Sequence, residues 1–447
     1  MLSILGQASR YCDGVSRRGF LKIGGLSFGA AGFSLADLYR AEAAAGNTGS
    51  HKAVINIFLA GGAPHQDMWE IKTDAPSEIR GEFRPIPTNV SGIEICEVFP
   101  QLASMMDKAA VCRAVVGCHG GHEAFQCMTG WGTQDLRSVG GRPAIGSAVS
   151  KLFGPVDPSV PPYVGLAAPT SHGPWSDSGK PGFLGSAHGP FKPDGPGMQN
   201  MKLNGITLDR LGDRRLLLGE LDQMKREIDI TGAMSGMDVF GQRALDVLTS
   251  SKLVDALDLS KEDPRIVERY GDGKPYKYQY DGAPTCNDHL LIARRLIEAG
   301  VRVVSLSYGR WDSHSANFDL VRDHGSKLDQ CLSALIEDLD LRGMLDDVSI
   351  VVWGEFGRTP QINAAAGRDH WPKVASAFLA GGGIRGGQAI GKTNRLGEEA
   401  AERPVHMQEI VATLYHNLGI DTNAVTLADP TGRPQFLADH PPIHELI

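Results

Sequence analysis

The feature that most constrains the fold is an alternation of helical and strand patterns in the second half of the chain. Residues 287–299 carry apolar side chains at helical spacing, and the apolar run 301–307 follows at once. The same order returns with helical spacing over residues 327–342 and an apolar run at 349–353. Because buried parallel strands alternate with helices in this way, the sequence predicts an α/β fold. Its doubly wound, mostly parallel central sheet should be sandwiched by helices.

The composition is that of a folded protein and excludes several classes. The chain has 447 residues, 42% of them hydrophobic and 21% charged, which is ample for a buried core. Its formal net charge of -8 argues against a general nucleic-acid binder, which needs a basic surface. No apolar run in the body of the chain reaches the ~20 residues of a membrane span, so we expect no mature transmembrane segment.

The first 45 residues have the pattern of an export signal. The motif S-R-R-G-F-L-K at residues 16–22 is of the twin-arginine kind, and a mild apolar stretch at 23–36 leads to small residues at 41–45 that suit cleavage. The alternative is a chance arginine pair before an amphipathic helix. We expect residues 1–45 to be a signal peptide read by the twin-arginine export machinery. The mature protein is then expected to be periplasmic or extracellular.

The remaining residues, 46–447, are predicted to form a single α/β domain with a loop-rich and helical insertion over about 153–285. Residues 153–205 are rich in Pro and Gly, and their aromatic side chains favour an ordered loop region over a linker. Residues 207–258 have helical patterns and are expected to complete this insertion or cap.

Six cysteines follow the predicted signal peptide, and an even number in an oxidising compartment permits disulfides. Their spacings fit no zinc-ribbon or haem pattern. Cys331 lies on the apolar stripe of a predicted helix and is expected in the core. A bridge among Cys112, Cys118 and Cys127 is the alternative that the spacing leaves open.

Polar side chains capable of binding ligands collect at the ends of the predicted strands. Ligands bind open α/β sheets beyond the carboxyl ends of the strands, so these residues are the candidates for function. After the apolar run 52–59 come His65 and Asp67; after 301–307 come Arg310, Asp312 and His314; after 349–353 come Glu355 and Arg358. Two further groups are His119 with His122, and Asp369 with His370 ahead of the apolar run 374–380.

Each of these residues has an ordinary structural explanation by itself. An aspartate after a strand is most often a helix cap, and a histidine in a Gly-rich loop is most often solvated. Several carboxylates at one edge are electrostatically unfavourable unless a cation lies among them. Mixed histidine and carboxylate ligands suit Zn²⁺ or Mn²⁺, with iron as a further option, better than Ca²⁺ or Mg²⁺. The sequence therefore predicts one or two divalent metal ions at this edge.

Two arginines lie beside these candidate ligands. Arg310 and Arg358 have the charge and geometry to pair a sulfate or phosphate group, and with His65 they are the predicted substrate-binding residues. The alternative for each arginine is a surface salt bridge.

The motifs that contain these residues resemble those of the DUF1501 family. They are G-G-x-P-x-x-D at 61–67, H-x-x-H at 119–122 with a later T-G, W-D-x-H at 311–314, G-E-F-G-R-T at 354–359 and G-R-D-H-W at 367–371. The resemblance runs from about residue 52 to the C-terminal tail. This family consists of twin-arginine-signalled exported proteins related to the sulfatase and alkaline phosphatase superfamily.

The resemblance implies an alkaline phosphatase/sulfatase-like fold with metals at the strand ends. Glu355 stands where the superfamily has an Asp-His pair, which changes the second metal position, and Asp369 would help or orient its neighbour His370. The metal ligands that the resemblance implies are Asp67, Asp312, His314, Glu355, Asp369 and His370.

The nucleophile of the superfamily is missing. Sulfatases carry a C/S-x-P-S-R signature, but the matching position here is Gly120, and Cys118 is out of register. Thr129 matches a structural turn and is a poor nucleophile. Either His119 or His122 ligates metal and a metal-bound hydroxide attacks, or the site no longer catalyses. Together with Arg358 these two histidines are the predicted catalytic residues.

The sequence thus favours an exported, metal-dependent hydrolase of sulfate or phosphate esters, acting on a small-molecule or carbohydrate substrate. The second hypothesis is a non-catalytic metal- or glycan-binding protein of the same fold. A third is a structural partner in an envelope complex.

Overall fold

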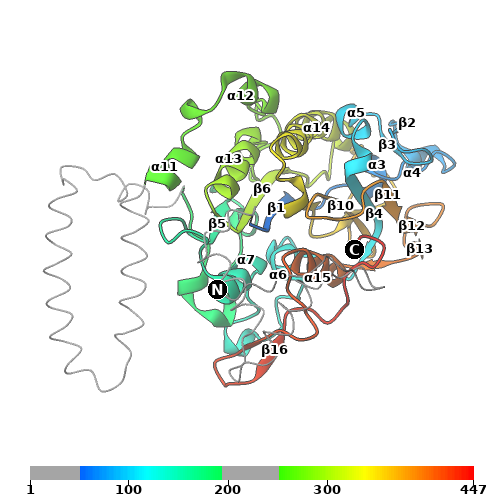
Figure 1. Cartoon of the computed structure of the whole chain (residues 1–447). Helices are drawn as coiled ribbons and strands as arrows, with labels where there is room; N and C mark the ends of the chain where they lie inside the picture. The colour runs from blue at the N-terminus through cyan, green and yellow to red at the C-terminus, as the bar shows by residue number, and fades with distance from the viewer. Residues whose placement is uncertain (1–50, 194–250) are drawn as a thin grey trace, which may run out of the picture. The chain divides into compact units, whose positions relative to one another are not determined.

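A mixed, mostly parallel sheet forms the centre of the fold. The computed structural model describes residues 51–193 and 251–447, within the compact unit Ser50–Ile447. In these residues eight strands form one sheet in the order β11-β4-β10-β7-β1-β6-β5, with β14 paired to β4 (Figure 1). Strand β10 is antiparallel to β7 and β4, and every other pairing in the sheet is parallel. The predicted α/β class is confirmed.

The strands predicted from apolar runs are all present at the centre of this sheet. They are β1 (Ala53–Ala60), β6 (Val303–Arg310), β7 (Val348–Trp353) and β10 (Ala375–Ala380). Four strands that the apolar runs did not reveal complete it: β4 (Ala109–Val116), β5 (Tyr163–Leu166), β11 (Gln388–Ile390) and β14 (Val405–His406).

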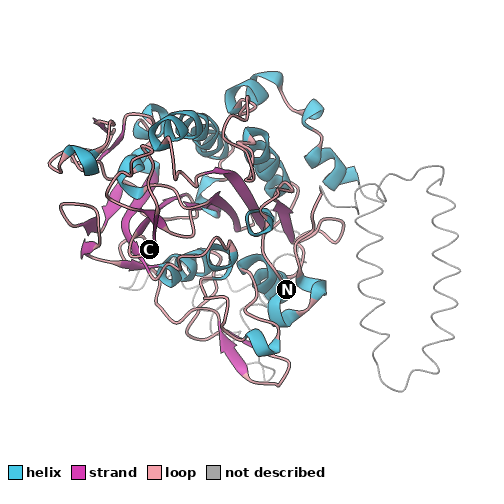
Figure 2. Cartoon of the chain, turned by 180° about the vertical axis from the view of Figure 1, so that it is seen from behind, coloured by secondary structure: helices cyan, strands magenta, loops and turns pink. Residues whose placement is uncertain are grey.

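Helices cover both faces of the sheet, which explains why β1 is apolar without alternation. Its side chains alternate between two cores: Ile55 and Ile57 belong to one, and Val54 and Phe58 to the other. The first core lies under α13 (Asn287–Glu298) and α14 (Asn317–Leu341), and the second under α7 (Ile145–Phe153) and α15 (Met407–Asn417). Figures 1 and 2 show these two helical layers on opposite sides of the strands.

Helix α14 begins ten residues before the predicted start at residue 327. The Gly325-Ser326 pair interrupts the helical pattern in the sequence, so the pattern does not reveal the first turns of α14. In the structure Gly325 lies where the helix packs closely on Val98, and a Cβ there would come within 2.7 Å of Val98 Cγ1. The glycine thus serves close packing inside a helix and does not end it.

The segment predicted as a loop-rich insertion contributes to the main sheet. Strand β5 is an edge strand paired with β6, and Trp175 is buried in the described part of the loop region. Most of the predicted helical stretch, residues 207–250, lies outside the described residues. Helices α11 (Ser251–Leu257) and α12 (Pro264–Tyr270) follow it.

Several short α-helices and small sheets, besides short 3-10 helices, lie outside the central sheet. The helices are α3 (His65–Met68), α4 (Ser77–Arg80), α5 (Pro100–Ala103) and α6 (Phe125–Thr129). The small two-stranded sheets pair β2 (Pro85–Pro87) with β3 (Glu94–Cys96), β8 (Gly357–Arg358) with β9 (His370–Trp371), β12 (Lys392–Thr393) with β13 (Ala400–Glu402), and β15 (Thr426–Ala428) with β16 (Pro434–Phe436).

The disulfide that the sequence left open is not formed. Cys112, Cys118 and Cys127 are free thiols, and all three contact the core beneath α7 and α15. Burial raises the pKa of the Cys112 thiol to about 12, which keeps it a protonated apolar side chain. Cys331 is a core residue as predicted. Among the described residues, no helix combines the length and apolarity needed to cross a membrane. The predicted signal peptide lies outside them.

Candidate metal centre

The direction of β10 brings a late segment of the chain to the functional edge of the sheet. Because β10 runs antiparallel to β7, the residues before β10 lie at the edge where β1, β6 and β7 end. Strand β9 precedes β10 and pairs with β8, so that Arg358 lies opposite His370. This pairing places His370 beside the residues that follow β6.

Four of the predicted residues meet at this edge. They are His122, Asp312, His314 and His370, and each offers one ligand atom within 4.8 Å of the others. Nε2 of His314 and Nε2 of His370 lie 3.0 Å apart, and they are 3.1 and 3.2 Å from Asp312 Oδ1. Nε2 of His122 lies 3.5 Å from the second oxygen, Oδ2, of Asp312.

All three imidazoles present the same nitrogen to this point, because an oxygen acceptor holds the other one. Nδ1 of His122 donates to Glu355 Oε1 at 3.2 Å, and Nδ1 of His314 donates to Asp369 Oδ1 at 2.7 Å. Nδ1 of His370 faces the backbone oxygen of Gly120 at 3.4 Å. With Nδ1 held in this way, each ring presents Nε2 inward, and Nε2 can bind a metal once it has given up any proton, as metal-ligating histidines do.

The spacing of these atoms fits a small divalent ion. Ligand atoms about 2.0–2.1 Å from a tetrahedral ion are separated by roughly 3.3 Å. The separations among Nε2 of His314, Nε2 of His370 and Asp312 Oδ1 are 3.0–3.2 Å, close to that value. Without a proton or a cation between them, these lone pairs would repel one another. The donor set, three imidazoles and one carboxylate, therefore fits a bound metal.

The pKa values of His122 and Asp312 also indicate that positive charge belongs at this position. Burial by itself would lower the pKa of His122, but its hydrogen bonds with Asp312 and Glu355 raise that pKa to about 9. Burial would raise the pKa of Asp312, but His122, His370 and the Arg358 guanidinium hold it well below its usual range. The Asp312 carboxylate thus stays charged and attracts the proton that His122 holds, and a divalent ion would take the place of that proton.

Glu355 orients His122 and lies outside the ligand cluster. Its carboxylate accepts the backbone N–H groups of Gly61 and Gly62 at 2.9 Å each, and Trp175 Nε1 lies 3.4 Å away. Gly61 adopts a φ of +95°, and a Cβ there would lie 2.6 Å from the backbone nitrogen of Asp312. The two glycines therefore form a tight turn that holds Glu355, and Glu355 holds the His122 ring.

Asp67 also lies outside the cluster, although the resemblance implies that it is a ligand. Arg368 donates to both of its oxygens, from Nε at 2.7 Å and Nη2 at 2.9 Å, and Asn317 Nδ2 donates at 2.7 Å. Asp67 and Arg368 are both fully buried. The carboxylate is thus neutralised by a fixed cation and serves as a structural brace.

The two candidate arginines have different environments. Arg358 is fully buried, donates to the backbone oxygens of Gly62 and Arg368, and contacts Asp312, so it positions that carboxylate. Arg310 donates to Asp281 at 2.8 Å and keeps 17% of its side chain exposed, with Nη2 3.7 Å from Asp312 Oδ2. Of the two, Arg310 is the one that can reach a substrate anion.

Two predicted histidines do not join the cluster. His65 is buried beneath the edge, and burial lowers its pKa to about 3, so it is a neutral packing residue and not a substrate contact. His119 is exposed, and its backbone N–H donates to Gln126 Oε1. Of the two histidines in this loop, only His122 belongs to the cluster.

The loop region before α11 supplies contacts that the sequence motifs did not reveal. The rings of Trp175 and His172 lie roughly perpendicular to the His122 ring, at centroid distances of 4.8 and 5.4 Å. Phe356 lies against His370 at 4.5 Å. The aromatic residues of this Pro- and Gly-rich segment indicated order, but nothing local indicated contact with His122.

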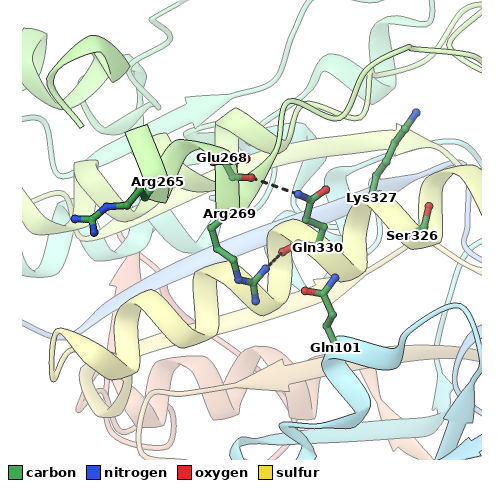
Figure 3. Close-up of a pocket in the computed structure, with 7 residues that line it drawn as sticks. All are labelled: Gln101, Arg265, Glu268, Arg269, Ser326, Lys327 and Gln330. Carbon is green, nitrogen blue, oxygen red and sulfur yellow. Dashed lines mark hydrogen bonds between the residues drawn. The ribbon is translucent and has the colours of Figure 1, made fainter. Parts of the chain in front are cut away.

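An open cavity of about 600 Å³ lies between α12 and α14, but it is a poor candidate for the site (Figure 3). Two of its charged side chains already have partners: Arg269 pairs with Glu337 at 3.0 Å, and Lys327 with Asp323 at 2.9 Å. None of the residues that line it belongs to the histidine cluster. They are Gln101, Arg265, Glu268, Arg269, Ser326, Lys327 and Gln330.

The fold and the cluster define an α/β protein with a candidate metal centre at the carboxyl edge of its sheet. Residues 51–447 match the family described as "Protein of unknown function (DUF1501)", and the chain belongs to this family. The family resemblance predicted from the motifs is confirmed. No curated protein matches the chain. Among solved structures, the PsFucS1 sulfatase from Pseudoalteromonas sp. is similar at 12% identity and a TM-score of 0.37. That match covers 86% of this chain and 70% of the sulfatase.

Proposed function

We propose that the protein is a metal-dependent hydrolase of sulfate or phosphate esters of small molecules or carbohydrates. One observation carries the proposal: three imidazoles, each oriented through Nδ1, direct Nε2 at a single buried carboxylate. A metal site explains this arrangement. Packing alone does not require three imidazoles to direct the same nitrogen at one carboxylate. The motif resemblance to the sulfatase and alkaline phosphatase superfamily supports the choice of ester class.

The residues of the cluster would hold the ion and the substrate in defined positions. A divalent ion held here would supply a Lewis acid and lower the pKa of a bound water. Asp312, held by Arg358, and the three histidines would bind the ion, while Glu355 and Asp369 fix the ring orientations. Arg310, with its partly exposed guanidinium beside Asp312, would pair an oxygen of the sulfate or phosphate group.

The donor set favours Zn²⁺ or Mn²⁺ over Ca²⁺ or Mg²⁺, since three of the four donors are imidazoles. We propose one ion at this centre. Asp67 and Glu355, the residues implied for a wider site, have their oxygens occupied by Arg368 and by backbone N–H groups.

Elemental analysis of the purified protein, followed by a panel of aryl sulfates and phosphate esters, tests the proposal. We expect about one Zn²⁺ or Mn²⁺ per chain and turnover that a chelator removes and the ion restores. His370→Ala should abolish turnover, whereas His119→Ala, which changes an exposed histidine outside the cluster, should retain it. Unchanged metal content and turnover in His370→Ala would contradict the proposal.

A second candidate function is a metal- or glycan-binding protein without turnover. The observation in its favour is that no side-chain nucleophile is poised in the described site. The Thr129 hydroxyl is engaged with the backbone of Phe125 and Trp131. Stoichiometric metal together with no turnover of any ester in the panel would favour this function.

We also propose that the protein is exported in folded form by the twin-arginine machinery and acts in the periplasm or outside the cell. The motif at residues 16–22 supports this. Replacing Arg17 and Arg18 together by Lys should leave the protein in the cytoplasm, as measured by cell fractionation. Export that persists in the double variant would reject the proposal.

A further inference from the structure

A second group of metal-binding side chains lies at the start of α13, apart from the histidine centre. It consists of Cys286, Asp288 and His289, whose sulfur, one carboxylate oxygen and one ring nitrogen lie within 4.8 Å of one another. None of the three belongs to the candidate metal centre. Cys286 is buried, and the other two are half-buried, so a bound ion would be shielded but reachable.

We propose that Cys286, Asp288 and His289 bind a second divalent ion, Zn²⁺, through one thiolate, one carboxylate and one imidazole. Three protein ligands leave the fourth tetrahedral position to water. A thiolate ligand selects Zn²⁺ against Ca²⁺ and Mg²⁺, which prefer oxygen donors.

The histidine is already oriented for this role. Its Nδ1 lies 3.1 Å from the backbone oxygen of Leu166, at the end of β5. A carbonyl oxygen only accepts, so Nδ1 carries the proton and Nε2 keeps its lone pair. A backbone acceptor on one ring nitrogen is the usual companion of a metal on the other.

Two features beside Cys286 would stabilise its thiolate when an ion binds. Cys286 is the N-cap residue of α13, a position where the helix dipole stabilises a thiolate. The Tyr276 hydroxyl lies 3.8 Å from its sulfur and can donate to it. When the ion binds, the thiol proton leaves to solvent, and the +2 charge balances the thiolate and the Asp288 carboxylate.

Co²⁺ titration of the full-length, chelator-stripped and reduced protein distinguishes this site from the histidine centre. Co²⁺ bound to a thiolate has a near-ultraviolet charge-transfer band, and the histidine centre has no thiolate ligand. We expect the band to saturate at about one Co²⁺ per chain and to vanish when Zn²⁺ is added. Absence of the band in the wild-type protein would overturn the proposal, whatever happens at the histidine centre.

Variants locate the site. Cys286→Ser should lose the band, whereas Cys118→Ser, which changes a half-buried thiol elsewhere, should retain it. Asp288→Asn and His289→Gln keep the thiol and should weaken Co²⁺ binding at least about tenfold, so they decide the matter if Cys286→Ser fails to fold. A band retained in folded Cys286→Ser, or unchanged affinity in both other variants, would overturn the proposal.

Discussion

Asp67 and Asp312 both lie at the carboxyl edge of the sheet, yet their surroundings give them opposite roles. Asp67 is fully buried and accepts hydrogen bonds from two nitrogens of the Arg368 guanidinium. Asp312 contacts Arg358 through one oxygen, but its other neighbours include three imidazoles. A guanidinium is always charged and offers no lone pair, whereas an imidazole can lose its proton and bind a metal. The type of cationic partner therefore separates a structural carboxylate from a candidate ligand.

The largest effect should come from removing the brace. Asp67→Ala leaves Arg368 buried without its counter-charge, and we expect the free energy of unfolding to fall by about 3–5 kcal/mol. Urea denaturation measures this loss. Asp319→Ala, which removes an exposed partner of Arg322, should change stability by less than about 1 kcal/mol. A loss in Asp67→Ala no larger than in this control would show that the pair is not a brace.

Around Asp312, by contrast, a substitution should lower metal affinity and leave stability almost unchanged. His314→Ala removes a candidate ligand whose side chain is 46% exposed, so the stability of the metal-free protein should change by less than about 1 kcal/mol. Its metal affinity should fall more than about 100-fold, because even residues that only support a ligand are worth 10–100-fold. Calorimetric titration with Zn²⁺ gives the affinity. Equal affinities in the variant and the wild type would remove His314 from the centre.

A smaller loss of metal affinity should follow from changing Asp369, which orients the His314 ring. Asp369→Asn weakens the acceptor that holds His314 Nδ1, and we expect metal affinity to fall about 10–100-fold with no loss of stability. The same titration measures it, with Asp319→Asn as the matched exposed control. An affinity loss as large as that of His314→Ala would instead make Asp369 a ligand.

The burial of His65, two residues before Asp67, should also appear in the pH dependence of stability. Burial lowers the pKa of His65 from 6.5 to about 3, so the unfolded chain binds the proton more readily between these values. Stability from this group is present above pH 6.5 and is lost as the pH falls toward 3, by up to about 1.4 kcal/mol per pH unit. When urea denaturation is measured at several pH values, His65→Gln should remove this part of the pH dependence of the free energy of unfolding. His416→Gln, on the exposed face of α15, should retain it. An unaltered pH dependence of stability in His65→Gln would contradict the conclusion that His65 is buried and neutral.

Local patterns in the sequence determined the class of fold, the central strands and the family. Apolar runs and helical spacing depend on neighbouring residues alone, which is why β1, β6, β7 and the helix α13 were predictable. The strand-end rule selected Asp312 and His314, and two further sequence groups supplied the other residues that the structure brings together. Together these residues are His122, Asp312, His314 and His370, with Asp369 beside them.

Tertiary structure alone decided which of the predicted side chains face one another. Asp67, Glu355 and Arg358 have the same strand-end signature as the ligands, but Arg368, the Gly61-Gly62 turn and Asp312 engage them from distant parts of the chain. The antiparallel direction of β10 and the early start of α14 likewise depend on partners far away in sequence. A carboxylate becomes a ligand or a brace through the charge packed against it, and that charge is set only when the chain has folded.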